Sequence, residues 1–215
     1  MTAGNSDPGA RASAQAIAGL DEAGRGPLAG PVVAAAVVFP AGYTNPEIRD
    51  SKKLTAKRRE RLVSIIKRDA LSWSVVAVGH RRIDRINILQ ASKLAMSLAS
   101  RRVKTDYLLV DGNQRIQSPL PQETIVHGDA LCVEISAASI LAKVWRDGLM
   151  DRLEVKYPGY GFARHAGYPT SSHREAIARL GPSRVHRRTF RGVLEYVQAT
   201  QAQHQKIPEE YSASL

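Results

Sequence analysis

Four carboxylates stand where the predicted secondary structure changes. Asp21 and Glu22 follow one predicted strand, Asp111 follows a second and Asp129 follows a third. Strand ends in α/β sheets open into crevices that bind ligands, so we expect these acids to converge. Carboxylates that share a crevice repel one another unless cations lie between them, and Mg²⁺ takes oxygen ligands. The pattern predicts a divalent metal site, where two ions can hold an attacking water and a leaving oxygen in line across a phosphodiester.

The same acids have a simpler interpretation when each is taken alone. Asp111 and Asp129 stand in Asp-Gly and Gly-Asp pairs, which commonly form turns. Adjacent strand residues point to opposite faces, so Asp21 and Glu22 share a site only where the chain is leaving its strand. Two glycines shortly after Glu22 favour such an exit. The residues by themselves leave the metal site and the turns both open.

The hydrophobic pattern predicts an α/β domain with a mixed sheet. The expected elements are strands at 16–20 and 32–39, a helix after Thr55, a strand at 73–78, a helix over 88–98, strands at 107–110 and 124–126, and helices at 133–153 and 171–180. This order mixes hairpin-type and crossover connections, which indicates a layered domain. Residues 1–15 and 200–215 are interpreted as flexible tails around one domain at 16–199.

Composition favours an anionic partner. The 215 residues include 31 Lys+Arg and 20 Asp+Glu, a net charge of +11, which favours nucleic acid over membrane, with a solvated basic surface as the alternative. The longest apolar run, at 32–39, is too short for a bilayer, and no secretory signal is visible. The single cysteine, Cys132, excludes an internal disulfide and fits a reducing cytoplasm. We therefore expect a cytoplasmic protein without a membrane partner.

The segment Gly24-Arg25-Gly26 suggests dinucleotide binding, but that fingerprint requires a third glycine where Ala29 stands and a helix afterwards. P-loop and G-x-S-x-G motifs are absent from the sequence. The two glycines instead permit close approach of the backbone to a ligand, whose phosphate or sugar hydroxyls their N–H groups could meet.

These acids and glycines belong to a series of motifs that runs along most of the chain. The motifs are Asp21-Glu22-Ala23-Gly24-Arg25-Gly26, Asp50-Ser51-Lys52-Lys53-Leu54, Val110-Asp111-Gly112-Asn113, Gly128-Asp129, the run from Glu134 to Val144, Gly167-Tyr168-Pro169-Thr170 and His186-Arg187-Arg188-Thr189-Phe190. In this order they resemble the bacterial type 2 ribonucleases H (ribonuclease HII). The resemblance implies a ribonuclease H-like fold, with a mixed central sheet flanked by helices and a C-terminal helical part from about residue 155.

The resemblance also implies an activity. Family members are metal-dependent endonucleases that hydrolyse the RNA strand of RNA–DNA hybrids and cleave at ribonucleotides embedded in duplex DNA, leaving 5′-phosphate and 3′-hydroxyl ends. Asp21, Glu22, Asp111 and Asp129 match the family's catalytic carboxylates, which bind two Mn²⁺ or Mg²⁺ ions. We expect a monomer. A non-catalytic nucleic-acid-binding module of the same fold is the alternative, although acids close to phosphates oppose binding.

Substrate contacts are implied in the same way. Gly24, Arg25 and Gly26 match the loop on the 2′-hydroxyl side of the scissile junction, and Tyr168 matches the tyrosine that works with this loop. The 2′-hydroxyl is the group that distinguishes RNA from DNA. Trp145 departs from the family, which commonly has a smaller polar residue there.

Basic side chains are candidates for contact with backbone phosphates. The candidates are Lys52, Lys53, Lys143, Arg146, Arg184 and Arg187. The histidines at 127, 165, 173 and 186 have spacings that fit no metal-ligand pattern, so we expect surface or supporting roles for them.

Overall fold

The computed structural model describes residues 8–48 and 55–205, so Lys52 and Lys53 lie outside the described residues. The chain divides into two compact units. The first comprises the chain up to Arg25 together with Pro31–Leu149, and the second comprises Gly26–Gly30 and the chain from Met150 onward. Within the described ranges, no helix has both the length and the apolar character that a membrane span needs.

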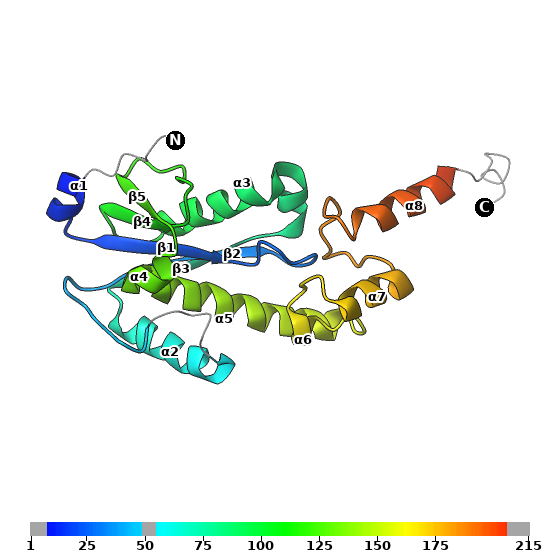
Figure 1. The fold of residues 1–215 in the computed structure, drawn as a ribbon, viewed down its shortest axis with the longest axis horizontal. Coiled ribbons are helices and arrows are strands. Elements are labelled where there is room, and N and C mark those ends of the chain that lie inside the picture. The colour runs from blue at the N-terminus through cyan, green and yellow to red at the C-terminus, as the bar shows by residue number, and fades with distance from the viewer. Residues whose placement is uncertain (1–7, 49–54, 206–215) are drawn as a thin grey trace. The chain divides into compact units, whose positions relative to one another are not determined.

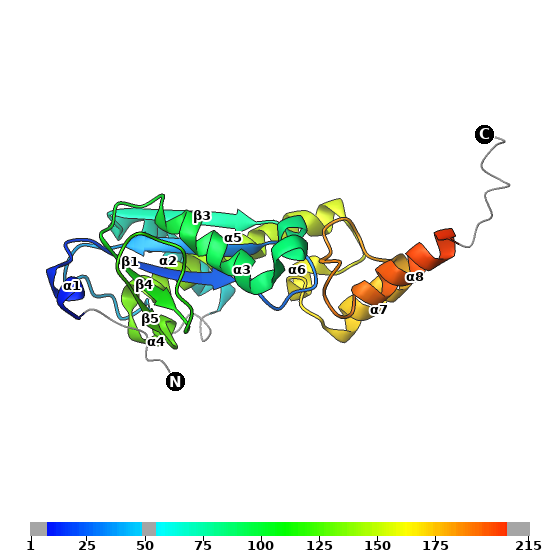
Figure 2. The same cartoon turned by 90° about the horizontal axis from the view of Figure 1, so that it is seen from above.

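A five-stranded mixed sheet forms the centre of the first unit (Figure 1). Its strands are β1 (Ile17–Ala23), β2 (Val32–Val38), β3 (Ser72–Val78), β4 (Tyr107–Asp111) and β5 (Gln122–Ile125). In space their order is β3-β2-β1-β4-β5, so that β3 and β5 form the two edges (Figure 2). The pairs β1–β2 and β2–β3 are antiparallel, whereas β1–β4 and β4–β5 are parallel. The predicted α/β class with a mixed sheet is confirmed.

Helices cover both faces of this sheet. The helices that begin in the first unit are α1 (Pro8–Ser13), α2 (Ala56–Asp69), α3 (His80–Ser100), α4 (Gly128–Leu131) and α5 (Val133–Lys156). Figure 1 shows α3 on one side of the sheet and α2 and α5 on the other. Val33, Ala35 and Val37 of β2 pack in one core with α2 and α5. Every residue of β2 is buried, which explains its unbroken apolar run.

Local signals explain where two of these helices begin. The Thr55 side chain caps α2 by accepting a hydrogen bond from the backbone N–H of Arg58, so that the helix begins after Thr55, as the sequence predicted. Helix α3 begins at His80, eight residues before the predicted start, and is interrupted at Asn87, where φ is +63°. The Asn87 side chain accepts from the N–H of Gln90 at 3.1 Å and so caps the second segment. The apolar stripe therefore predicted only this second segment.

The second unit is helical. It contains the end of α5 and the helices α6 (Phe162–His165), α7 (Ser171–Leu180) and α8 (Leu194–Gln205). Its core is formed by apolar side chains, among them Leu28, Met150, Phe162 and Ile177. The predicted bounds of α7 are confirmed, because the Thr170 side chain caps its start and Gly181 follows its end with φ at +71°. Parts of both predicted tails are helical, in α1 and in α8.

We predict that Gly19→Ala destabilises the first unit. A Cβ at Gly19 would lie 2.2 Å from the carbonyl carbon of Glu134 and 2.3 Å from the nitrogen of Ile135, which are backbone atoms that cannot turn aside. Overpacking of this kind costs about 3 kcal/mol of unfolding free energy, measured by urea titration. Gly148→Ala in α5 is the control, because nothing lies within 4 Å of its added Cβ. This control should gain about 0.5–1 kcal/mol, and equal effects at the two positions would contradict the prediction.

Candidate active site

Asp21 and Asp111 come from neighbouring parallel strands. The pairing of β1 with β4 runs up to Leu20 and Val110, and the next residue of each strand is the acid. Gly19, two residues before Asp21, abuts the first turn of α5. Because every second residue of a strand points to the same face, Asp21 also points toward α5. Parallel pairing therefore places the two carboxylates side by side on the face that α5 covers.

The expectation that the first strand ends before Asp21 is wrong. Pairing with β2 continues to Ala23, so that Asp21 and Glu22 both lie inside β1, opposite Ala35 and Ala34. Alternation then directs their side chains to opposite faces. Glu22 is nevertheless close enough to Asp111 for that carboxylate to raise its pKa. Three of the four predicted acids therefore influence one another electrostatically.

The fourth acid is linked to this group through the backbone. The N–H of Gly128 donates a hydrogen bond to Asp111 Oδ1 at 2.8 Å, and Asp129 is the next residue, 4% exposed in the first turn of α4. A Cβ at Gly128 would lie 2.5 Å from Cδ1 of Ile135, so a larger residue would force either this side chain or the turn to shift. The Gly-Asp pair is therefore both a helix start and the element that positions Asp129.

The pKa values of Asp21 and Glu22 are raised in the folded protein. Burial raises the pKa of Asp21 well above its ordinary value, and the charges of Glu22 and Asp111 raise it further, while a hydrogen bond from the Ser139 hydroxyl opposes the rise. Burial also raises the pKa of Glu22, and Arg25, with Nη1 at 3.4 Å from Oε1 of Glu22, opposes that rise. Bringing these groups together as anions therefore costs free energy that a cation would recover.

Ser139 of α5 was not predicted as a site residue. It is a hydroxyl-bearing residue, 9% exposed, in the otherwise mostly apolar stretch at 135–142. A polar side chain in such a stretch needs a buried partner, and here that partner is Asp21. This requirement was visible in the sequence, but the identity of the partner was not.

The donor set suits a hard divalent cation, because all of its ligating atoms are carboxylate oxygens. Within residues 8–48 and 55–205, no three His, Cys, Asp or Glu side chains already form a metal-binding cluster. Like charges keep such carboxylates apart. The predicted acids therefore lie near one another, but their carboxylates are not close enough together to form a ready-made metal-binding cluster within the described residues.

The glycine-rich segment after β1 closes over a buried arginine. Gly24 has φ at +96°, and a Cβ there would lie 2.1 Å from Nε of Arg146. The Arg146 side chain is 1% exposed and donates from Nε to the carbonyl oxygen of Pro31 at 3.1 Å. Because it is buried against the backbone, the prediction that Arg146 contacts phosphate is wrong.

In the second unit, two predicted substrate residues lie together. A Cβ built on Gly26 would lie 3.5 Å from Cε1 of Tyr168, whose side chain remains exposed. The N–H of Leu28 donates to the carbonyl oxygen of Gly167 at 2.8 Å, which ties the two segments to each other. Arg187 is fully buried, and its Nε donates to the carbonyl oxygen of a neighbouring glycine at position 30. The phosphate contact predicted for Arg187 is therefore wrong as well.

The remaining predicted contacts are placed differently. The ammonium of Lys143 lies 2.8 Å from Oδ1 of Asp147, one helical turn further along α5, and is partly exposed. Arg184 is exposed, and Trp145 is 40% exposed. These side chains are accessible to a ligand, in contrast to Arg146.

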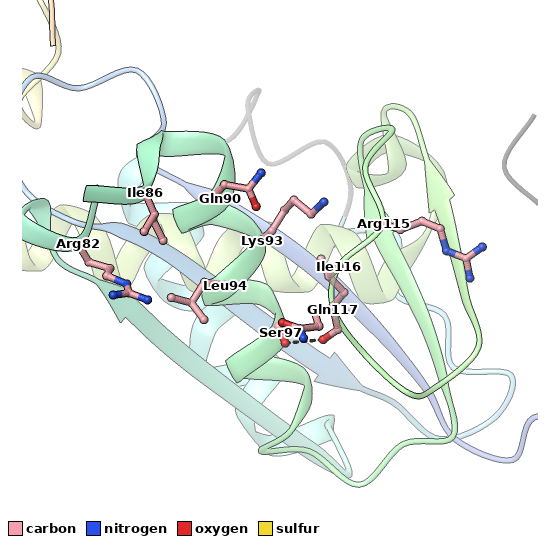
Figure 3. A pocket seen from close by; sticks show the side chains of 9 residues that line it. All are labelled: Arg82, Ile86, Gln90, Lys93, Leu94, Ser97, Arg115, Ile116 and Gln117. Carbon is pink, nitrogen blue, oxygen red and sulfur yellow. Dashed lines mark hydrogen bonds between the residues drawn. The ribbon is translucent and has the colours of Figure 1, made fainter. Parts of the chain in front are cut away.

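A separate cavity of about 500 Å³ lies between α3 and the loop that follows β4 (Figure 3). Its charged lining residues are Arg82, Lys93 and Arg115, and its polar ones include Ser97, whose hydroxyl donates to the carbonyl oxygen of Gln117 at 2.6 Å. None of the four acids lines this cavity. The chemistry predicted from the carboxylates therefore does not belong to it.

We predict that Asp21→Asn stabilises the protein in the absence of divalent ions. Asp21 has a raised pKa in the folded state, so its contribution to stability is present below about pH 3.9 and is lost as the pH rises through the folded-state pKa. The variant should therefore melt a few degrees above the original protein at pH 7, and the gain should vanish near pH 3.5. In a chain of this length, 1 kcal/mol corresponds to about 2–4 °C.

The matched control is Asp151→Asn, which removes the same charge from an exposed position of α5. Melting temperatures of all three proteins are measured by calorimetry at both pH values. A gain that is equal at the two positions, or one that persists at pH 3.5, would show that the burial of Asp21 is not the cause.

Comparison with known proteins agrees with this architecture. The family model for Ribonuclease HII matches residues 18–193. The chain is 54% identical over 183 residues to the Ribonuclease HII of Syntrophotalea carbinolica, covering 84% of this chain and 88% of that protein. It is 54% identical over 190 residues to the Ribonuclease HII of Geobacter sulfurreducens, covering 87% and 88%. The ribonuclease H2 structure from Pyrococcus horikoshii superposes with a TM-score of 0.72 at 27% identity, covering 86% of this chain and 99% of that chain. The chain therefore belongs to the ribonuclease HII family, and with it to the ribonuclease H endonucleases.

Proposed function

We propose that Asp21, Glu22, Asp111 and Asp129 are the catalytic carboxylates and hold two divalent ions, Mn²⁺ or Mg²⁺. The observation that carries this proposal is the parallel pairing of β1 with β4, which sets Asp21 beside Asp111; the charge of Asp111 helps to raise the pKa of both Asp21 and Glu22, which agrees with this proximity. The bond from Gly128 to Asp111 brings Asp129 into the same region. When bound, such ions activate water for attack on phosphorus and stabilise the leaving 3′-oxygen.

The protein's own groups prepare this site. The Ser139 hydroxyl and the backbone N–H of Glu22 both donate to Asp21, which favours its ionised form and fixes its orientation. The N–H of Gly128 fixes Oδ1 of Asp111 in the same way. Arg25 is paired with Glu22 and is half exposed, so it can neutralise the carboxylate or turn toward a phosphate. These contacts orient the ligands before substrate arrives, which reduces the cost of reorganisation.

The substrate we propose is the RNA strand of RNA–DNA hybrids, together with ribonucleotides embedded in duplex DNA. Cleavage would leave 5′-phosphate and 3′-hydroxyl ends. Gly24, Arg25 and Gly26 would approach the ribose through their backbone, and the exposed ring of Tyr168 would complete the recognition of the 2′-hydroxyl side. The proximity of Gly26 to the Tyr168 ring within one unit supports this pairing of roles.

The net charge of +11 supports binding to a nucleic-acid backbone. Lys52, Lys53 and Lys143 are the proposed phosphate contacts, and Lys143 would exchange its bond to Asp147 for a phosphate oxygen. We further propose that the enzyme works as a monomer in the cytoplasm, a reducing compartment with which its single free cysteine is compatible.

Asp111→Asn tests the carboxylate assignment. On a DNA duplex that carries one ribonucleotide, with Mn²⁺ or Mg²⁺, we expect the variant to cleave at least about 100-fold more slowly, because loss of a partner outside the ligand set already costs 10–100-fold. Mn²⁺ should also raise the melting temperature of the original protein more than that of the variant. Asp151→Asn is the control. Unchanged cleavage by Asp111→Asn would overturn the assignment, and inactivity of the original protein would favour a binding module.

Tyr168→Ala tests ribonucleotide recognition. Packing of an aromatic ring on a nucleotide contributes about 1–3 kcal/mol, so we expect cleavage at a single embedded ribonucleotide to fall about ten-fold or more. Tyr196→Ala, at a similarly exposed tyrosine of α8, should leave the rate unchanged. Rates are compared under single-turnover conditions. If both variants cleave like the original protein, Tyr168 has no role in recognition.

A further inference from the structure

Two histidines of the second unit are buried beside the segment that carries Tyr168. His173 is 0% exposed and His186 is 1% exposed. Their Nε2 atoms lie 3.1 Å apart, so one proton must lie between the two rings. The rings of Tyr160 and Phe162 pack around His186. Of the surface and supporting roles expected for the histidines, burial excludes the surface role for these two and leaves the supporting one.

A backbone N–H determines which nitrogen of His186 carries the proton. The N–H of Ser183 donates to Nδ1 of His186 at 2.9 Å, and the Ser183 hydroxyl oxygen lies 2.8 Å from the same atom. Since a backbone N–H can only donate, Nδ1 of His186 must be an acceptor without a proton. The neutral imidazole then carries its proton on Nε2, which points toward His173.

A backbone carbonyl determines which nitrogen of His173 carries the proton. Nδ1 of His173 lies 2.9 Å from the carbonyl oxygen of Tyr168. A carbonyl can only accept, so Nδ1 of His173 carries the proton and its Nε2 is a bare acceptor. The two ends are therefore compatible in one arrangement: Ser183 donates to His186, His186 donates to His173, and His173 donates to Tyr168. Burial lowers the pKa of His173, in keeping with a neutral ring.

A third histidine holds the residue before Tyr168. Nε2 of His165 lies 2.9 Å from the carbonyl oxygen of Tyr160, so it carries the proton, and Nδ1 accepts from the N–H of Gly167 at 3.2 Å. Gly167 has φ at +78°, and Ala166 before it has φ at +47°. A non-glycine residue in the left-handed region costs free energy, so this segment needs contacts that hold it in place.

We propose that His186 and His173 form a directed hydrogen-bond relay that positions Tyr168, and that they are positioning residues for ribonucleotide recognition. The proposal rests on the proposed role of Tyr168. The relay anchors the Tyr168 carbonyl to the 183–186 segment, while the Tyr168 ring stays exposed beside Gly26. Breaking a link would free the ring from the geometry in which it meets the ribose, and would leave a buried donor or acceptor unsatisfied.

The amide side chains provide a matched test. An asparagine amide lies near the place of a histidine's Nδ1, and a glutamine amide lies near the place of Nε2. His173→Asn keeps the donor to Tyr168, whereas His173→Gln loses it. His186→Gln keeps the donor to His173, whereas His186→Asn loses it. We therefore expect asparagine to be the better replacement at 173 and glutamine to be the better one at 186.

The readout is the ratio of cleavage at a single embedded ribonucleotide to cleavage of a long RNA–DNA hybrid, with the melting temperature of each variant measured in parallel. We expect His173→Gln and His186→Asn to lower this ratio about ten-fold, and the double variant His173→Gln/Tyr168→Ala to lose no more than Tyr168→Ala alone. A purely packing role would rank the two amides in the same order at both positions, and that result would overturn the relay.

A measurement on the unaltered protein separates the relay from the role of Tyr168. Nitrogen-15 NMR distinguishes protonated from bare imidazole nitrogens, and we expect protons on Nδ1 of His173 and Nε2 of His186 at neutral pH. The opposite tautomers, or a charged ring, would overturn the relay even if the variants fail to fold. If the tautomers are as expected but Tyr168→Ala cleaves normally, the recognition role fails and His173 and His186 are not positioning residues for it.

Discussion

The parallel pairing of β1 with β4 is the constraint on which the candidate site depends. It places two acids, the buried Asp21 and the partly buried Asp111, on adjacent strands and on one face of the sheet. The burial of Asp21 and the repulsion between the two acids oppose folding, and the rest of the first unit must compensate. The compensation comes from the apolar core around β2 and from hydrogen bonds that Ser139 and Gly128 donate to the acids. A site that costs stability in this way is characteristic of function rather than of packing.

Two glycines allow helices α4 and α5 to lie close to the acids of β1 and β4. At Gly19 the backbone of α5 lies where a Cβ would be, which brings Ser139 within reach of Asp21. At Gly128 the absence of a side chain lets the start of α4 lie against Ile135 and Asp111. A larger residue at Gly19 would push the backbone of α5, and Ser139 with it, away from Asp21. In the first unit, the close packing of helices on the sheet therefore also sets the environment of the acids.

In the second unit, side chains hold the backbone next to an exposed aromatic ring, that of Tyr168. The segment around Tyr168 contains two consecutive left-handed residues, Ala166 and Gly167, and is therefore not held by regular secondary structure. Two imidazoles contact the backbone of this segment: Nδ1 of His165 accepts from the N–H of Gly167, and Nδ1 of the buried His173 lies 2.9 Å from the carbonyl oxygen of Tyr168. Buried Arg187 does the same for the 26–30 segment by bonding to a carbonyl oxygen. In both places a residue type usually associated with catalysis or phosphate binding stabilises backbone geometry.

The sequence by itself determined the α/β class, the order of the five strands and of helices α2, α3, α5 and α7, the start of α2 after Thr55 and the bounds of α7, because these depend on local periodicity and capping. It also singled out the four acids through the motifs that contain them. Only the tertiary structure decided that Asp21 and Glu22 lie inside β1, that α3 is interrupted at Asn87, and that Arg146 is buried. Strand ends depend on pairing partners, and the role of a polar side chain depends on what surrounds it. Both are set by residues far away in the chain, which local patterns do not encode.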